Sequence, residues 1–154
     1  MDVLNLVGTT KSNQVKILDR HPRYFMYDSE NVELGRAFVI YHRIVPQFAI
    51  GMSAKQQKIL SKSAEVHICK FEDFVSEEEK AEATRELLVK LLYKAECKHL
   101  KSIWSIMPTP DNEFIKYEED LFESWNDGLH FVRVLNKKED PVEAFWRTTG
   151  NNII

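Results

Sequence analysis

Histidine and cysteine side chains in one apolar stretch, residues 64–71, are the first candidates for chemistry. His67 and Cys69 stand two positions apart there, and a strand would place both on one face, about 7 Å apart. A cysteine nucleophile needs its histidine base within hydrogen-bond reach and a third group to orient that base. The spacing therefore favours an ordinary half-buried strand face over a nucleophile pair.

The other histidines offer donor atoms for a metal site. His42, His99 and His130 fall in separate expected elements. Together with His67 and an acid such as Glu65, they would supply nitrogen and oxygen ligands. The chain has no HExxH spacing, however, and its two cysteines form no CxxC pair. We therefore predict no metal, and the cysteine usage fits a reducing compartment.

These side chains must be positioned by the best-specified part of the chain, residues 63–131. Ser76 and Glu79 have the spacing of a capping box, in which each side chain bonds the other residue's amide at the start of a helix. Apolar residues then recur at helical spacing. Thr109 and Pro110 restart a second helix, and Gly128 ends it. The expected order is a strand at 64–71, a helix at 77–98, a strand at 102–107, a helix at 111–125 and a strand at 130–135.

The flanking regions are less sharply specified. We predict strands at 14–18, 36–44 and 142–149, an extended segment at 47–50, and a short helix from Ser53 to about residue 61. Residues 19–27 are ambiguous, because Pro22 can open a short helix. No linker divides the chain, so we expect one domain over residues 1–154, with residues 1–13 and 150–154 as docking tails.

Composition excludes several classes of protein. The chain has 154 residues, a formal net charge of −3 and a pI near 6.0. This balance gives no overall attraction toward nucleic acid or membrane. The sequence shows neither a signal-peptide pattern nor the roughly 20 apolar residues of a spanning helix. We expect a soluble protein of cytoplasmic type, or one packaged into a virion from that compartment.

From about residue 36 to residue 149, the order of elements resembles the GNAT (Gcn5-related N-acetyltransferase) fold. Residues 66–71 resemble its fourth strand, 76–98 its long third helix and 103–107 its fifth strand. Asn112 stands where the family often has an asparagine, and Gly128-Leu129-His130-Phe131 approximates its Gly-Phe ending. Small GNAT-like proteins of tailed bacteriophages, some of them virion components, are similar in layout. The resemblance implies an α/β (strictly α+β) fold with a mixed, mostly antiparallel sheet flanked by helices.

The chain departs from the family where the cofactor would bind. The family's motif, Gln/Arg-x-x-Gly-x-Gly/Ala, lies between the fourth strand and third helix, and its glycines bring backbone amides to the acetyl-CoA pyrophosphate. Residues 71–79 contain no glycine and five carboxylates. A like-charge contact at about 4 Å costs roughly 1 to 4 kcal/mol. We therefore expect no cofactor, with acetyl-CoA as the alternative.

If the chain is an enzyme, the resemblance assigns its parts. Glu65 or Glu72, with Asp73 nearby, would be the general base, and Tyr117 the general acid. Tyr117 does not stand at the family's usual position, because the family's tyrosine normally follows the asparagine by about seven positions, and Glu119 is found there. The cofactor-binding residues would then be Val75, Ser76, Glu77 and Asn112.

Basic and aromatic side chains alternate near the N-terminus, and Trp146 stands near the other end. Such mixtures occur in single-stranded nucleic-acid sites and in protein interfaces. Because the whole chain is negative, we expect a protein partner or self-assembly rather than nucleic acid. The proposed partner-binding residues are Arg20, Arg23, Tyr24, Phe25, Tyr27, Arg36 and Trp146.

The sequence thus favours a non-enzymatic interaction or structural protein on a degenerate acetyltransferase-like fold, encoded by a phage and associated with its virion. The alternative is an acetyl-CoA-dependent N-acetyltransferase with a divergent pyrophosphate loop. Response to acetyl-CoA separates the two, since a ligand at a hundredfold excess over its dissociation constant stabilises its protein by about 2.7 kcal/mol.

Overall fold

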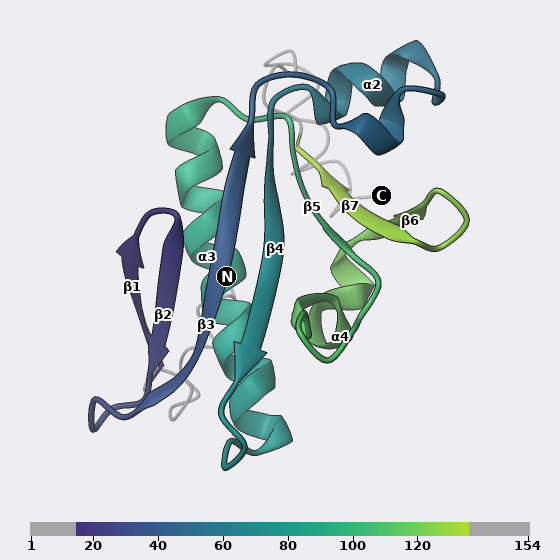
Figure 1. Cartoon of the computed structure of the whole chain (residues 1–154). Helices are drawn as coiled ribbons and strands as arrows, with labels where there is room; N and C mark the ends of the chain where they lie inside the picture. Colours follow the sequence, from purple (N-terminus) through teal and green to yellow (C-terminus); the bar gives the residue numbers. More distant parts are fainter. Residues whose placement is uncertain (1–14, 136–154) are drawn as a thin grey trace, which may run out of the picture.

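A computed structural model describes residues 15–135, which form a seven-stranded sheet (Figure 1). Strands β4 and β5 pair in parallel, and the other neighbouring strands are antiparallel. The strand order is β1 (Lys16–Arg20), β2 (Arg23–Tyr27), β3 (Glu33–His42), β4 (Ser63–Phe71), β5 (Ser102–Ile106), β7 (His130–Val134) and β6 (Glu123–Trp125).

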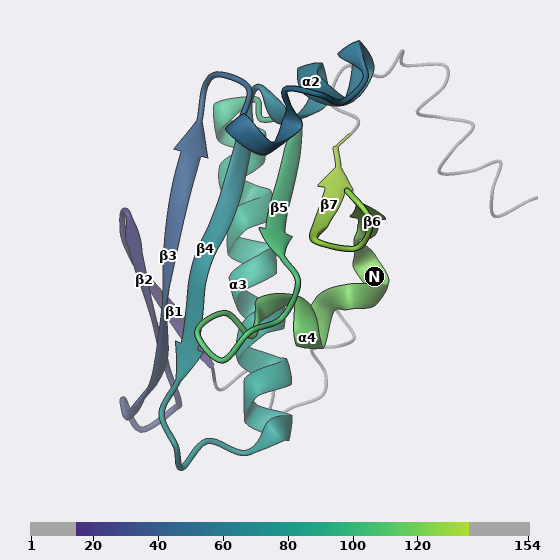
Figure 2. The ribbon, with the colours of Figure 1, turned by 45° about the vertical axis from the view of Figure 1, so that its right-hand side comes forward.

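Helices cover the two faces unequally. The long helix α3 (Glu77–Lys98) lies along one face of β1–β4, as the two ribbon views show (Figures 1 and 2). The main core fills the space between them, with Tyr24, Met26, Val66 and Leu87 fully buried. A smaller cluster around Trp104 lies on the other face, under η2 (Gln47–Ala49) and α2 (Ala54–Leu60).

Two of the three helix starts that the sequence specifies, at Ser53 and Ser76, are confirmed. The amide of Glu79 donates to the Ser76 hydroxyl oxygen at 3.1 Å, and the amide of Ser76 donates to the Glu79 carboxylate at 3.1 Å. Ser53 and Gln56 form the same box before α2. Helix α3 spans the predicted residues 77–98 and ends at His99, which adopts a left-handed conformation (φ 56°).

The predicted helix over residues 111–125 is wrong. Helix α4 covers Phe114–Glu118 and continues as the 3-10 turn η3 (Glu119–Leu121), and the chain then enters strand β6. Asn126, Asp127 and Gly128 all have positive φ, so they turn the chain back into β7 instead of ending a helix. Pairing with β7 gives this segment hydrogen bonds that a longer helix would forgo.

The structure resolves one ambiguous segment and corrects one expectation. Residues 19–27 form no helix: β1 and β2 make a hairpin that turns at His21 and Pro22, and the cross-strand ladder satisfies their backbone. Residues 47–50 form the 3-10 turn η2 instead of an extended segment. The predicted strand at 142–149 and both proposed docking tails lie outside the described residues.

The fold class is confirmed. The sheet is mixed and mostly antiparallel, and helices flank it. Helix α3 connects the parallel strands β4 and β5 along the chain, which is the GNAT-like order.

Candidate functional site

An irregularity in β4 creates the candidate site. Phe38 of β3 pairs with Ile68, and the next residue, Val39, pairs with Val66. His67 therefore has no partner on β3, and β4 contains a β-bulge at this residue. Such β-bulges redirect side chains and are common next to active sites. Beyond the bulge Cys69 faces the core, whereas His67 is exposed on the opposite face. The expectation that these two side chains share a face is therefore wrong.

A carboxylate held between two imidazoles lies at this bulge. Glu65 accepts from His42 Nε2 at 2.8 Å through one oxygen and contacts His67 Nδ1 at 2.9 Å through the other. Glu65 is 8% exposed, whereas the His67 side chain is 52% exposed. The Nε2 side of the exposed His67 ring is thus open to a proton donor, while Glu65 orients the ring through Nδ1. The sequence offered Glu65 as a base only if the chain is an enzyme, and it grouped Glu65 with His42 and His67 only as possible metal ligands.

Aromatic rings line the site on the β5 and β7 side. Trp104 stacks on His42 with ring centroids 5.5 Å apart, and Phe48 stacks on His130 at 3.6 Å. Asn126 contacts His130 Nδ1 at 3.1 Å. Burial lowers the pKa of His130 from its usual value, although the nearby Glu65 carboxylate partly opposes this effect. His130 is therefore a neutral ring at pH 7 that extends the aromatic wall.

The gap between β4 and β5 is closed by the chain itself. The two strands pair from Ser63 with Ser102 to Val66 with Ser105, and then separate. Past that point the amide of Cys69 donates to the Asp111 carbonyl at 3.1 Å, and the amide of Glu113 donates to the Cys69 carbonyl at 2.8 Å. Residues 111–113 therefore occupy the edge of β4 beyond its pairing with β5.

The side chain of Asn112 completes this closure. Its Nδ2 donates to the Val66 carbonyl at 2.9 Å, the His67 carbonyl at 3.2 Å and the Ser105 hydroxyl at 2.9 Å, and the residue is 1% exposed. The sequence assigned Asn112 to a cofactor only if the chain is an enzyme. In the structure its side chain satisfies the carbonyl groups of the bulge.

The turn from β4 into α3 does not fit a diphosphate. The capping box engages the amides of Ser76 and Glu79, and Val75 is buried with its amide bonded to the Glu72 carbonyl at 3.2 Å. Glu77 forms ion pairs with Lys80 and Lys116, so the two ammonium groups nearest this turn already have a carboxylate partner. The carboxylates around these groups are Glu72, Asp73, Glu77, Glu78 and Glu79. A phosphate would meet like charge where it requires donors.

The remaining predicted catalytic groups do not converge on Glu65. The Tyr117 hydroxyl donates to the Glu77 carboxylate at the start of α3, and burial together with this bond raises the pKa of Tyr117. Glu72 is exposed in the turn. Burial also raises the pKa of the Cys69 thiol, which removes it as a nucleophile. Within residues 15–135, no three histidine, cysteine, aspartate or glutamate side chains are arranged so that they could hold a metal ion.

The proposed partner-binding residues separate into two groups. Tyr24 is fully buried against α3, and its hydroxyl bonds that of Tyr41 at 2.7 Å. Trp146 lies outside the described residues. The others stand on the sheet face away from α3, and they are Arg20, Arg23, Phe25, Tyr27 and Arg36.

Comparison with known proteins supports the fold. No protein-family model matches the chain, and no curated protein matches it. Among solved structures, it is similar to the C-terminal condensation domain of Ebony in complex with beta-alanyl-dopamine, with 11% identity and a TM-score of 0.54 over 87% of this chain and 79% of that one. It is also matched to AtaT complexed with acetyl-methionyl-tRNAfMet, with 13% identity and a TM-score of 0.47 over 95% and 87% of the two chains.

At these identities the comparison with Ebony shows the fold alone, and the weaker match to AtaT carries no argument. Neither comparison bears on a phage or virion origin. Within the described residues, no helix has the length and apolar character needed to cross a membrane.

Proposed function

We propose that this protein is an acyltransferase that joins an activated acyl group to an amine. The observation that carries the proposal is the contact of Glu65 with His67 at the β4 bulge, beside the point where β4 and β5 separate. A histidine oriented by a buried carboxylate is a common general base. This favours the enzyme alternative over the non-enzymatic reading of the sequence.

The chemistry assigned to these residues is proton transfer. The acceptor nitrogen attacks the carbonyl carbon of an acyl thioester, the carbon–sulfur bond breaks, and a thiolate leaves. His67 Nε2 takes the proton from the nitrogen as the amide bond forms and returns it to the thiolate. Glu65 keeps the Nδ1 proton of His67 in place and stabilises the imidazolium, while His42 holds Glu65 from the other side.

We infer that the acceptor is an arylalkylamine, an amine whose nitrogen is carried on an alkyl chain attached to an aromatic ring. Phe38 is half-buried and meets His67 edge to face with ring centroids 6.2 Å apart. Aromatic rings bind other rings by stacking or edge contact, worth about 0.5–1.5 kcal/mol beyond area burial. The condensation domain of Ebony is bound to beta-alanyl-dopamine, which is itself an amide of an arylalkylamine.

The donor that this reaction requires is an acyl thioester. Because the turn before α3 does not fit a diphosphate, we do not assign coenzyme A as its carrier. The test supplies tyramine with either the acetyl thioester of N-acetylcysteamine, which has no phosphate, or acetyl-CoA. We expect N-acetyltyramine by mass spectrometry with the phosphate-free donor.

The variant His67→Gln should lower this rate by about 10²- to 10⁴-fold, the usual contribution of a general base. Glu65→Gln should lower it as well. The matched control is His21→Gln, which changes an exposed histidine in the β1–β2 turn and should leave the rate unchanged. Absence of product with both donors, or equal rates for His67→Gln and the control, would overturn the proposal.

A second candidate function is that of a binding protein without catalytic activity, which is the interpretation that the sequence favours. A role as a component of a phage virion is part of this second candidate. The binding function is supported by one observation: residues 111–113 close the edge of β4, with Asn112 buried against the bulge. Failure of the acyl-transfer assay with a folded protein would favour it.

A further inference from the structure

The face of β1–β4 away from α3 is open within the described residues. Helix α3 packs on the opposite face, and α2 lies toward β5 at the end of the sheet (Figures 1 and 2). Arg23, Arg36 and Lys70 are exposed on this face, while Phe25, Tyr27 and Phe38 are half-buried between them. We call these six residues the cationic strip.

The cations and rings of this strip alternate in register across the strands. Phe25 pairs with Arg36, which pairs with Lys70. In the next row, Arg23 pairs with Phe38. The Arg36 guanidinium lies 5.1 Å from the centroid of the Phe25 ring, and that of Arg23 lies 5.9 Å from the centroid of Phe38. The rings of Phe25 and Phe38 therefore each have a positive charge directly beside them.

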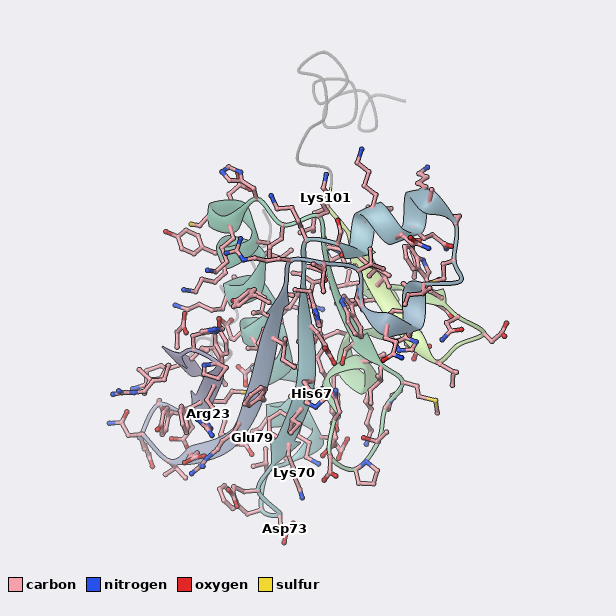
Figure 3. All side chains as sticks on the ribbon, turned by 45° about the horizontal axis from the view of Figure 1, so that its top comes forward. Arg23, His67, Lys70, Asp73, Glu79 and Lys101 are labelled. Carbon is pink, nitrogen blue, oxygen red and sulfur yellow. The ribbon has the colours of Figure 1, made fainter. Side chains whose placement is uncertain are left out.

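Neighbouring residues extend this pattern to the edge strand. Arg20 and Lys16 of β1 pair with Arg23 and Tyr27, and both are exposed. Figure 3 shows Arg23 beside β2 and Lys70 at the lower end of β4, with His67 higher on the same strand. The strip thus runs across four strands and reaches the candidate site, where Phe38 meets His67.

Charge is distributed unevenly despite the net value of −3. Glu33 pairs with Arg36, and Asp111 pairs with Lys70. Arg20 and Arg23 have no carboxylate of the described residues in ion-pair contact. The dense acidic cluster lies in the turn from β4 into α3, where Figure 3 labels Asp73. An anionic ligand would find its counter-charges on the strip and not at that turn.

We propose that the cationic strip binds single-stranded nucleic acid. Bases can stack on aromatic rings that a sheet presents, and arginine guanidinium groups can pair with the phosphates. Phe25, Tyr27 and Phe38 supply the rings. Arg23 and Arg36 of the strip supply the charges, together with the neighbouring Arg20 on β1. A duplex binds more weakly, because its stacked bases cannot reach the rings.

The test is fluorescence anisotropy of the full chain with labelled 12-nucleotide oligo-uridine and oligo-thymidine and with a 12-base-pair duplex. If about three phosphates are neutralised, log affinity falls with log salt with a slope near −2, so affinity should drop about fifteenfold from 50 to 200 mM salt. Phe25→Ala and Phe38→Ala should each weaken binding at least about fivefold.

Arg23→Glu tests the charge with the least risk to folding, because Arg23 is exposed at the start of β2. The matched control is Lys55→Glu on α2, which is also exposed and changes the net charge by the same amount. We expect Arg23→Glu to abolish binding at 200 mM salt and Lys55→Glu to bind as the parent does.

Three results would overturn the proposal. They are no binding of either single strand at 50 mM salt, equal binding of duplex and single strands, and equal affinity of the Arg23→Glu and Lys55→Glu variants. Self-association that Arg23→Glu abolishes, without any nucleic-acid binding, would assign the strip to contacts between copies of the chain.

Discussion

Buried carboxylates have two different environments in this molecule. Glu65 lies between two histidines next to solvent, as an orienting group requires. Glu118 on α4 is 2% exposed and accepts from Thr84 Oγ1 at 2.8 Å and Arg85 Nε at 2.9 Å on α3. Burial raises the pKa of Glu118, and both hydrogen bonds oppose that shift. Its role is therefore to join α4 to α3.

Replacing Glu118 by alanine should destabilise the fold by about 2–4 kcal/mol. The change removes two hydrogen bonds to a charged group and leaves a cavity between the helices. Glu119→Ala, one position further and exposed, should change stability by less than about 0.5 kcal/mol. Urea unfolding of both variants measures the difference, and equal midpoints would contradict the assigned role.

The neutral His130 should make stability depend on pH. Its pKa is lowered in the folded state by burial, so the unfolded chain takes up a proton more readily as pH falls below about 6.5. The contribution of His130 is therefore present at pH 7.5 and is lost toward pH 5. Phe48, Trp104 and Asn126 surround the ring, and the Glu65 carboxylate reduces the effect without reversing it.

Thermal melts of the His130→Phe variant at pH 7.5 and pH 5 test this sign. The parent should lose more Tm between these pH values than the variant, whose ring stacks on Phe48 without titrating. His99→Gln, at the exposed end of α3, should keep the parent's pH dependence. A larger loss in His130→Phe than in the parent would contradict the assignment.

At the scale of elements, the meeting of β4, β5 and the segment before α4 decides what the site can bind. The bulge at His67 leaves the Val66 and His67 carbonyls directed away from a regular ladder partner, and Asn112 satisfies both. Ser105 also donates to the Val66 carbonyl at 2.6 Å. The edge of β4 is thus closed by hydrogen bonds within the chain.

Asn112→Ala should open this edge and destabilise the protein by about 2–3 kcal/mol, because it removes buried hydrogen bonds to carbonyl groups that then lack a donor. Hydrogen exchange at the amides of Cys69 and Glu113 should accelerate, since both amides bond across the closed edge. Asp111→Ala removes only the exposed ion pair with Lys70 and should cost at most about 1 kcal/mol. Unchanged exchange in Asn112→Ala would show that the closure does not depend on this side chain.

For the molecule as a whole, the separation of charge matters more than its sum. Carboxylates gather at the start of α3, and cations gather on the open sheet face. A negative ligand is consequently repelled from the position where the resemblance to acetyltransferases would place its phosphates.

Acetyl-CoA at 1 mM should therefore shift the Tm of the parent protein by less than about 1 °C. A ligand present at a hundredfold excess over its dissociation constant would add about 2.7 kcal/mol, or several degrees for a chain of this size. The variant Glu72→Gln/Asp73→Asn reduces the repulsion and should bind acetyl-CoA no more weakly than the parent. A shift of several degrees in the parent would restore coenzyme A as the donor's carrier.

Local patterns in the sequence were sufficient to predict several elements. The capping box at Ser76 and Glu79, helix α3 and strands β3, β4 and β5 depend on residues close together in the chain, and the GNAT-like order follows from their succession. The misassigned residues 111–125 show the limit of this reasoning. Their apolar spacing fits a helix, but pairing with β7, which the sequence does not display, makes Glu123–Trp125 a strand.

Only the tertiary structure decided the candidate site. The sequence offered Glu65 or Glu72 as a base only if the chain is an enzyme. The contacts of Glu65 with His42 and His67 are set by the pairing of β3 with β4 and by a one-residue bulge that no local signal marks. The burial of Tyr24 and the closure by Asn112 likewise depend on contacts between distant segments. The sequence by itself determined the elements that local signals mark: helix caps, apolar spacing and runs of β-branched residues. The site required the structure, because register and side-chain contacts between strands arise only when residues far apart in the chain are brought together.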